Sequence, residues 1–183
     1  IFRKEFPQFK EIQEQLTEVW GIERYNHRTH IWSLPHDRKI ELGSVNTPRA
    51  QERYKGRPHD VKGFDELPDF TRTVYRFLIA WNRTSLPDQR CRVISTGNPP
   101  TTPEGEWVIQ YWGPWLDSQH PHPASSGELR WFAMVDGEDK EVENGSSFTF
   151  KGETIYPKSR TFILSRVEDN PFLGEDYYAR LSN

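Results

Sequence analysis

Two adjacent acids, Asp65 and Glu66, could carry metal and acid–base chemistry. They lie at the end of a short strand that we expect over Val61–Asp65, although Lys62 makes this run less apolar than a buried strand should be. A parallel strand that ends in two acids delivers both carboxylates to the carboxyl edge of its sheet, where open α/β folds bind ligands. Asp65 could hold Mg²⁺, directly or through water, and Glu66 could orient and deprotonate an attacking water.

A second polar group follows the next expected strand, Arg92–Thr96. It reads Ser95-Thr96-Gly97-Asn98-Pro99-Pro100. The amide of Asn98 could contact a γ-phosphate or the attacking water, while Gly97 permits a tight backbone turn and the prolines end the strand. Because parallel strands end at the same edge, we expect this group beside Asp65 and Glu66. An ordinary strand-to-loop turn is the alternative for either group alone.

The two strands require a connecting helix, and the sequence predicts one. We expect Asp69 to cap a helix that runs to Trp81, with Phe70, Val74 and Phe77 on its apolar face. Strand, helix and strand within about 35 residues are typical of a βαβ unit with a right-handed crossover.

The remaining elements complete an α/β architecture with a β-rich C-terminal region. The apolar spacing predicts a helix over residues 6–20, a hairpin of strands 29–34 and 39–45, and a short helix over residues 107–115. Further strands are expected in residues 128–164, with turns at Asp136-Gly137 and Asn144-Gly145, and a last helix in residues 175–181.

Composition excludes several classes of protein. A chain of 183 residues with net charge −3 and pI near 6.1 has no overall attraction to nucleic acid, so any such contact must be local. A single cysteine, Cys91, excludes an internal disulfide and a cysteine-based zinc site. No apolar run approaches the ~18 residues of a membrane span, and the first residues lack the pattern of a signal peptide.

With the acid pair at residues 65–66 and the polar run at residues 95–100, the chain resembles the large terminase subunit of tailed bacteriophages, the motor that packages DNA. The resemblance covers most of the chain and is strongest over Arg53–Asp117. Its motifs are Arg53-Tyr54-Lys55-Gly56-Arg57-Pro58-His59-Asp60, Gly63-Phe64-Asp65-Glu66-Leu67, Ile79-Ala80-Trp81-Asn82-Arg83, Thr96-Gly97-Asn98-Pro99-Pro100, Glu104-Gly105-Glu106-Trp107-Val108 and Trp115-Leu116-Asp117, with Thr161-Phe162-Ile163 and Asp169-Asn170-Pro171 near the end.

The resemblance implies a role for each motif. Asp65 and Glu66 match the Walker B pair, so Asp65 would bind the Mg²⁺ of ATP and Glu66 would be catalytic. Thr96, Gly97 and Asn98 match the coupling motif. A protein of this family uses ATP to drive double-stranded DNA into the capsid, with the portal and the small terminase subunit as partners. It would work in the host cytoplasm, neither secreted nor in a membrane.

The sequence departs from the family at two points. It holds no Gly-x-x-x-x-Gly-Lys-Ser/Thr phosphate loop and no nuclease half with its metal-binding acids. With a first residue Ile1 and a single methionine, Met134, we expect an internal piece of a longer terminase that is inactive alone and binds no cofactor tightly. Its fold would be a partial P-loop NTPase sheet of the ASCE type with flanking helices, lacking the phosphate-loop strand: residues 1–117 from the ATPase core, residues 118–183 a β-rich subdomain and linker.

Further possibilities remain open at this level. The basic residues Arg49, Arg53, Lys55 and Arg57 could supply an arginine to a neighbouring subunit or contact DNA phosphate, or could form a solvated loop. Without the phosphate-loop strand, Arg92–Thr96 would present a free edge, which favours self-association. Two other functions also fit the motifs: another nucleotide-driven motor such as a helicase, and a non-enzymatic assembly or binding module.

Overall fold

The computed structural model describes residues 1–47 and 49–170, so the helix expected over residues 175–181 lies outside the described residues. The chain divides into two compact units, Ile1–Tyr111 and Trp112–Asn183. The division lies shortly before residue 117, where we placed the end of the ATPase core. Each unit is described by itself below.

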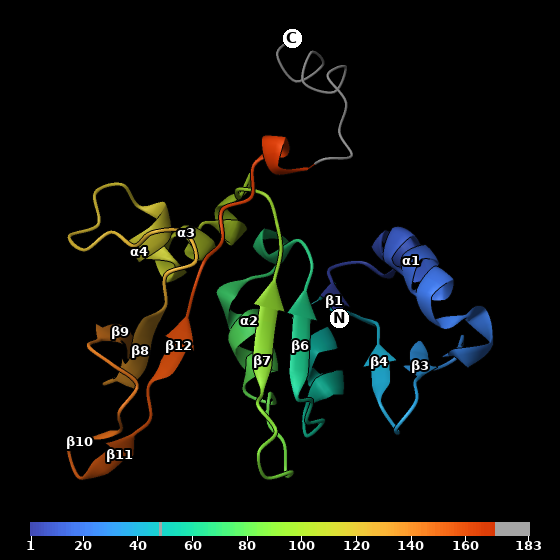
Figure 1. The fold of residues 1–183 in the computed structure, drawn as a ribbon, viewed down its shortest axis with the longest axis horizontal. Coiled ribbons are helices and arrows are strands. Elements are labelled where there is room, and N and C mark those ends of the chain that lie inside the picture. The colour runs from blue at the N-terminus through green and yellow to red at the C-terminus, as the bar shows by residue number, and fades with distance from the viewer. Residues whose placement is uncertain (48, 171–183) are drawn as a thin grey trace. The chain divides into compact units, whose positions relative to one another are not determined.

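A four-stranded parallel sheet organises the first unit. Its strand order is β5-β1-β6-β7, and β6 pairs with β7 from Val61↔Arg92 to Phe64↔Ser95. The helix α2 connects β6 to β7 and lies against one face of the sheet (Figure 1). The predicted βαβ unit is therefore confirmed. The bounds are β1 Phe2–Arg3, β5 Gly43–Ser44, β6 Val61–Phe64, β7 Arg92–Ser95 and α2 Arg72–Ile79.

Aromatic packing fixes α2 on the sheet. Tyr75 and Leu78 are buried, and the ring centroids of Tyr75 and Phe64 lie 5.0 Å apart. The prediction that Asp69 caps this helix is wrong. Asp69 ends a 3-10 turn, η4 (Leu67–Asp69), and the cap is Thr71, whose hydroxyl accepts a hydrogen bond from the Val74 amide at 3.3 Å. The chain needs an extended residue before the helix can begin, and Thr71 supplies it.

Strand β7 is the edge of the described sheet. The amides of Arg92 and Thr96 donate to Asp60 and Phe64 on the β6 side. Because successive residues of a strand point their backbone groups to opposite sides, Val93 and Ser95 direct theirs away from β6. Ile94 is 57% exposed on this strand. The free edge expected for Arg92–Thr96 is thus present in the described part of the chain.

A small helical and antiparallel layer lies between β1 and β5 in the chain. The predicted helix over residues 6–20 is confirmed as a 3-10 turn, η1 (Phe6–Phe9), followed by α1 (Lys10–Trp20), which ends at Gly21 with φ +80°. Ile12, Leu16 and Trp20 of α1 pack on a core of Phe9, Tyr25, Trp32 and Leu42. This core is closed by an antiparallel sheet of β2 (Tyr25–Asn26), β3 (Ile31–Ser33) and β4 (Lys39–Glu41).

The predicted hairpin is confirmed, but its second strand is shorter than expected. Residues 39–45 do not form one strand, because the chain leaves β4 after Glu41 and joins the parallel sheet as β5. A Cβ at Gly43 would meet the phenol oxygen of Tyr54, so the glycine permits this change of sheet. Tyr54 belongs to the 3-10 turn η3 (Ala50–Tyr54).

The helix expected over residues 107–115 is two shorter helices. Helix α3 (Trp107–Tyr111) ends the first unit, and α4 (Gly113–Leu116) begins after Trp112, whose φ of −109° and ψ of 32° are not helical. Trp107 is buried and donates its indole N–H to the Phe70 carbonyl at 2.7 Å.

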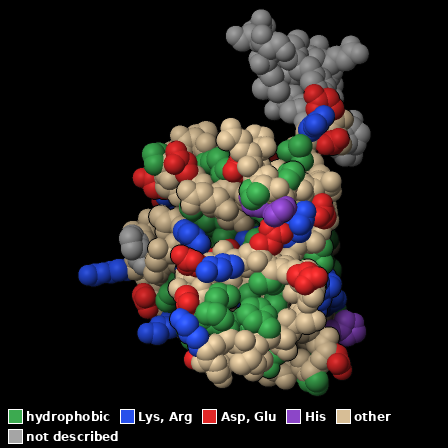
Figure 2. Space-filling model, turned by 90° about the vertical axis from the view of Figure 1, so that its left-hand side faces the viewer, with side chains coloured by type: hydrophobic (Ala, Val, Ile, Leu, Met, Phe, Trp, Pro, Cys, Tyr) green, Lys and Arg blue, Asp and Glu red, His purple; other side chains and the backbone are tan. Residues whose placement is uncertain are grey.

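The second unit is rich in antiparallel strands, as predicted for residues 128–164. Asp136 (φ 53°) and Gly137 (φ 80°) form the two-residue turn between β8 and β9, as their sequence predicts. Figure 2 shows acidic, basic and hydrophobic side chains interspersed on the face that it draws. One sheet has the order β12-β8-β9, with β10 and β11 forming a separate hairpin. The bounds are β8 Arg130–Val135, β9 Glu138–Val142, β10 Phe148–Phe150, β11 Glu153–Ile155 and β12 Lys158–Arg160.

Candidate functional site

The carboxyl ends of β6 and β7 lie side by side and bring the predicted polar residues together. The Thr96 hydroxyl donates to Asp65 Oδ1 at 2.6 Å, and the backbone N–H of Asn98 donates to Glu66 Oε2 at 3.4 Å. We call Asp65, Glu66, Thr96, Gly97 and Asn98 the carboxyl-edge cluster. The structure therefore gathers every residue that the sequence proposed for this edge, while the chemical roles assigned to them remain predictions.

Glu66 adopts a backbone conformation that is uncommon for its residue type. Its φ of 54° and ψ of 58° are left-handed, which costs a non-glycine residue about 1–2 kcal/mol. The turn is held by the Leu67 amide, which donates to the Thr96 carbonyl at 2.8 Å. Among the described residues six other non-glycine positions also have positive φ, so it is the place of Glu66 beside the end of β7, and not its backbone conformation, that makes it a candidate.

Gly97 allows the two strand ends to approach so closely. A Cβ at this position would lie 2.7 Å from Pro68 Cδ and 3.1 Å from the Leu67 nitrogen. The first contact is impossible for a real side chain, so an alanine here would push the loop after β7 away from the turn at Glu66. The glycine thus serves the geometry of the site as well as the end of the strand.

Arg3 is the one member of this region that sequence reasoning missed. It lies on β1, next to β6, and its guanidinium forms an ion pair with Asp65 Oδ2. Both side chains are largely shielded from solvent, with 21% and 23% of their surfaces exposed. A strand of two residues has no readable periodicity, so no pattern in the sequence could have placed Arg3 beside an acid 62 positions further along.

The donor set fits a magnesium ion that arrives with other ligands. Within residues 1–47 and 49–170, no three His, Cys, Asp or Glu side chains gather as a metal site. The carboxyl-edge cluster offers two carboxylates, and Mg²⁺ commonly binds proteins through one or two carboxylates plus phosphates and water. The Arg3 guanidinium already occupies Asp65 Oδ2, so a magnesium ion at this carboxylate would compete with it.

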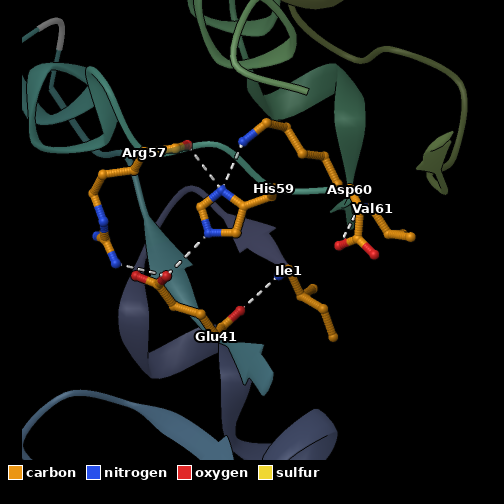
Figure 3. Close-up of polar contacts among 7 residues, drawn as sticks. Ile1, Glu41, Arg57, His59, Asp60 and Val61 are labelled. Atoms are coloured by element: carbon orange, nitrogen blue, oxygen red, sulfur yellow. Dashed lines mark hydrogen bonds and ion pairs between the residues drawn. The ribbon is translucent and has the colours of Figure 1, made fainter. Parts of the chain in front are cut away.

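A different polar cluster lies at the opposite, amino end of β6. Lys62 is only 1% exposed, and its Nζ lies 3.1 Å from His59 Nδ1. His59 Nε2 lies 3.2 Å from Glu41 Oε2, and Arg57 donates to the same oxygen at 2.9 Å (Figure 3). We call Glu41, Arg57, His59 and Lys62 the amino-end cluster. His59 Nδ1 lies near both a donor, the Lys62 ammonium, and an acceptor, the Arg57 carbonyl oxygen at 3.1 Å, so the imidazole links Lys62, Arg57 and Glu41.

The pKa values of Lys62 and Glu41 in the amino-end cluster are both lowered, for different reasons. Burial lowers the pKa of Lys62 to about 8, although Glu41 opposes the shift. Burial alone would raise the pKa of Glu41, but the His59 hydrogen bond and the Arg57 charge outweigh it and lower this pKa. Its neighbours therefore stabilise Glu41 as an anion, whereas they offset only part of the burial of the Lys62 ammonium.

The four basic residues proposed for DNA or for a neighbouring subunit do not act as one group. Arg57 belongs to the amino-end cluster, away from Asp65 and Glu66, and is ion-paired with Glu41. Arg49, Arg53 and Lys55 are exposed on and beside η3. Their proposed roles are not tested by these positions and remain predictions.

Comparisons with protein-family models, curated proteins and solved structures found no match for this chain. Among the residues that the structure describes, no helix combines the length and the apolar character needed to cross a bilayer. The functional reading therefore depends on the motifs of the sequence and on the geometry of the carboxyl-edge cluster.

Proposed function

We propose that this chain is part of the ATPase core of a large terminase subunit, and that its parent protein hydrolyses ATP to move double-stranded DNA into a phage capsid. The observation that carries the proposal is the juxtaposition of Asp65-Glu66 with Thr96-Gly97-Asn98 at the carboxyl edge of two parallel strands joined by a helix. Such an edge is where open α/β sheets bind their ligands.

The two acids suit different tasks in nucleotide hydrolysis. Asp65 is oriented by the Thr96 hydroxyl and ion-paired with Arg3, and in the proposed function its carboxylate would bind the cation of the nucleotide. The Glu66 carboxylate accepts the longer contact from Asn98 and is held on a strained turn. A carboxylate of this kind can orient a water and accept its proton. When bound, the magnesium ion of ATP would neutralise phosphate charge at this edge.

The proposed parent contains parts that this sequence lacks. A phosphate-loop strand would pair with the free edge of β7, and its loop would supply the amides and lysine that bind phosphates. The nuclease half would follow the segment described here. The 1–183 chain would therefore bind nucleotide weakly and hydrolyse it slowly or not at all. Its partners would be DNA, the portal and the small terminase subunit, in the host cytoplasm.

The test is DNA-stimulated ATP hydrolysis by the longer parent protein, compared between wild type and Glu66→Gln. Loss of a general base that acts in the transition state should lower turnover at least ~10²-fold while nucleotide binding is largely kept. Glu143→Gln, an equal change at an exposed acid in the second unit, should leave turnover unchanged. Normal turnover of the Glu66 variant would mean that the acid pair is structural, and the assembly-module reading would replace the motor.

A further inference from the structure

The ion pair between Arg3 and Asp65 raises a question that the proposed function does not answer. The carboxylate assigned to the cation already has both oxygens in use: Oδ2 contacts the Arg3 guanidinium, and Oδ1 accepts from the Thr96 hydroxyl. A divalent cation that approaches Oδ2 would therefore meet the positive charge of Arg3 at the same oxygen and compete with it. Either Asp65 is not a cation ligand, or Arg3 leaves Asp65 Oδ2 when the cation binds.

The position of Arg3 favours the second choice. Arg3 follows Phe2, which pairs with Phe64, so its side chain starts from the strand next to β6 at the same edge of the sheet. The neighbouring strand positions Gly43 and Ser44 carry no charge, and Lys4 is exposed. Arg3 is thus the cation that the fold directs to Asp65, and with 21% of its side chain exposed it retains a path to solvent.

We propose that Arg3 is an exchangeable positioning residue of the carboxyl-edge cluster: it holds Asp65 while no ligand is bound, and it releases Asp65 Oδ2 when the divalent cation of a nucleoside triphosphate binds. The identity of the ligand rests on the proposed function, whereas the competition between Arg3 and a divalent cation does not. Thr96 keeps its bond to Oδ1 throughout, so the carboxylate stays oriented during the exchange. No covalent bond changes in this step.

A charge argument gives the size of the effect. Arg3 both blocks one carboxylate oxygen and repels an incoming cation, and two unit charges a few ångströms apart interact by at least 1 kcal/mol even at high dielectric. Removing the guanidinium should therefore raise divalent-cation affinity by about fivefold or more. The effect should require Asp65, because the oxygen that Arg3 protects belongs to that residue.

The experiment is a Mn²⁺ titration of the 1–183 chain, with free Mn²⁺ measured by electron paramagnetic resonance. Arg3→Gln should bind Mn²⁺ at least about fivefold more tightly than wild type, and Arg3→Gln/Asp65→Asn should lose the gain. Lys4→Gln removes an equal charge from an exposed neighbouring position and should give a much smaller change. If Arg3→Gln fails to fold, Arg3→Lys, which cannot form the forked contact, should still bind more tightly than wild type.

Three results would overturn the proposal: equal affinity of wild type and folded Arg3 variants, a gain that persists without Asp65, or an equal gain in Lys4→Gln. The outcome is separable from that of the proposed function. An Arg3 effect on Mn²⁺ together with normal ATP turnover in Glu66→Gln would leave a cation site without the motor. A flat Mn²⁺ response together with lost turnover would leave the motor and make Arg3 a structural ion pair.

Discussion

The two ends of strand β6 carry polar clusters that differ in how completely their charges are satisfied. At the amino end, Lys62 is almost fully buried and linked through His59 to Glu41, which also binds Arg57. At the carboxyl end, Glu66 lies on a strained turn and accepts a 3.4 Å contact from the Asn98 amide. Two side chains of the fold contact the carboxylate of Glu41, whereas the Glu66 carboxylate retains capacity to accept hydrogen bonds from a ligand. The amino-end cluster and the carboxyl-edge cluster thus lie at opposite ends of the same four-residue strand, and only the second is a candidate site for a ligand.

The largest effect on stability should come from opening the amino-end cluster. Glu41→Ala removes the acid that faces Arg57 and, through His59, Lys62. Because Arg57 is 45% exposed, the loss of these charge-assisted contacts should cost about 2 kcal/mol of unfolding free energy. Urea unfolding measures the loss. Lys62→Met in the same chain should recover much of it, because no buried ammonium is then left without an acid. Equal losses in the single and double variants would contradict the network.

A smaller effect should appear in the pH dependence of stability. The pKa of Lys62 is about 8 in the folded chain and 10.5 in the unfolded chain, so between these values the unfolded state binds more protons and stability rises with pH. From pH 8 to 9.5 the rise should be roughly 1–2 kcal/mol. Burial raises the pKa of Tyr54, which works in the opposite direction only near pH 10 and above.

Urea unfolding at pH 8 and 9.5 measures this rise, and Lys62→Met is its control. The variant lacks the titrating group and should show a flat profile over the same range. The α-amino group of Ile1, whose pKa burial lowers to about 6, contributes mainly between pH 6 and 8 and adds only about 0.4 kcal/mol from pH 8 to 9.5, well below the rise expected from Lys62. A rise of equal size in Lys62→Met would show that another group is responsible.

The smallest expected effect has the opposite sign and belongs to the carboxyl end. Glu66→Gly removes the side chain from a left-handed position that glycine adopts freely, so unfolding free energy should rise by about 0.5 kcal/mol despite the greater freedom of the unfolded glycine. Glu14→Gly, in the exposed middle of α1, should instead lose about 1 kcal/mol. If both variants lose stability equally, Glu66 is not strained and this part of the comparison fails.

Local patterns predicted the fold where contacts are local. The β6–α2–β7 unit follows from two short strands around an amphipathic helix, and the turn at Asp136-Gly137 follows from its residue types. Helix 6–20 was equally readable. The cap at Thr71 was missed because Asp69 and Thr71 are both good capping residues, and only the 3-10 turn at Leu67–Asp69 decides between them.

The sequence was less informative where distant segments meet. It predicted which residues share the carboxyl edge, because parallel strands end together, but it could not supply Arg3 from a two-residue strand. In the sequence, Lys62 makes the run Val61–Asp65 less apolar than a buried strand should be. The polar partners of its buried ammonium are His59 and, through His59, Glu41 from β4. Residue spacing does not encode this long-range arrangement.

The most direct test measures both properties on both clusters in the longer parent protein: ATP turnover and unfolding free energy for Glu66→Gln and Glu41→Gln. The account predicts that Glu66→Gln loses at least ~10²-fold in turnover with little change in stability, while Glu41→Gln loses stability and keeps its turnover at temperatures where it is folded. Full turnover in Glu66→Gln, or a loss of turnover in folded Glu41→Gln as large as that in Glu66→Gln, would contradict the division of labour between the two ends of β6.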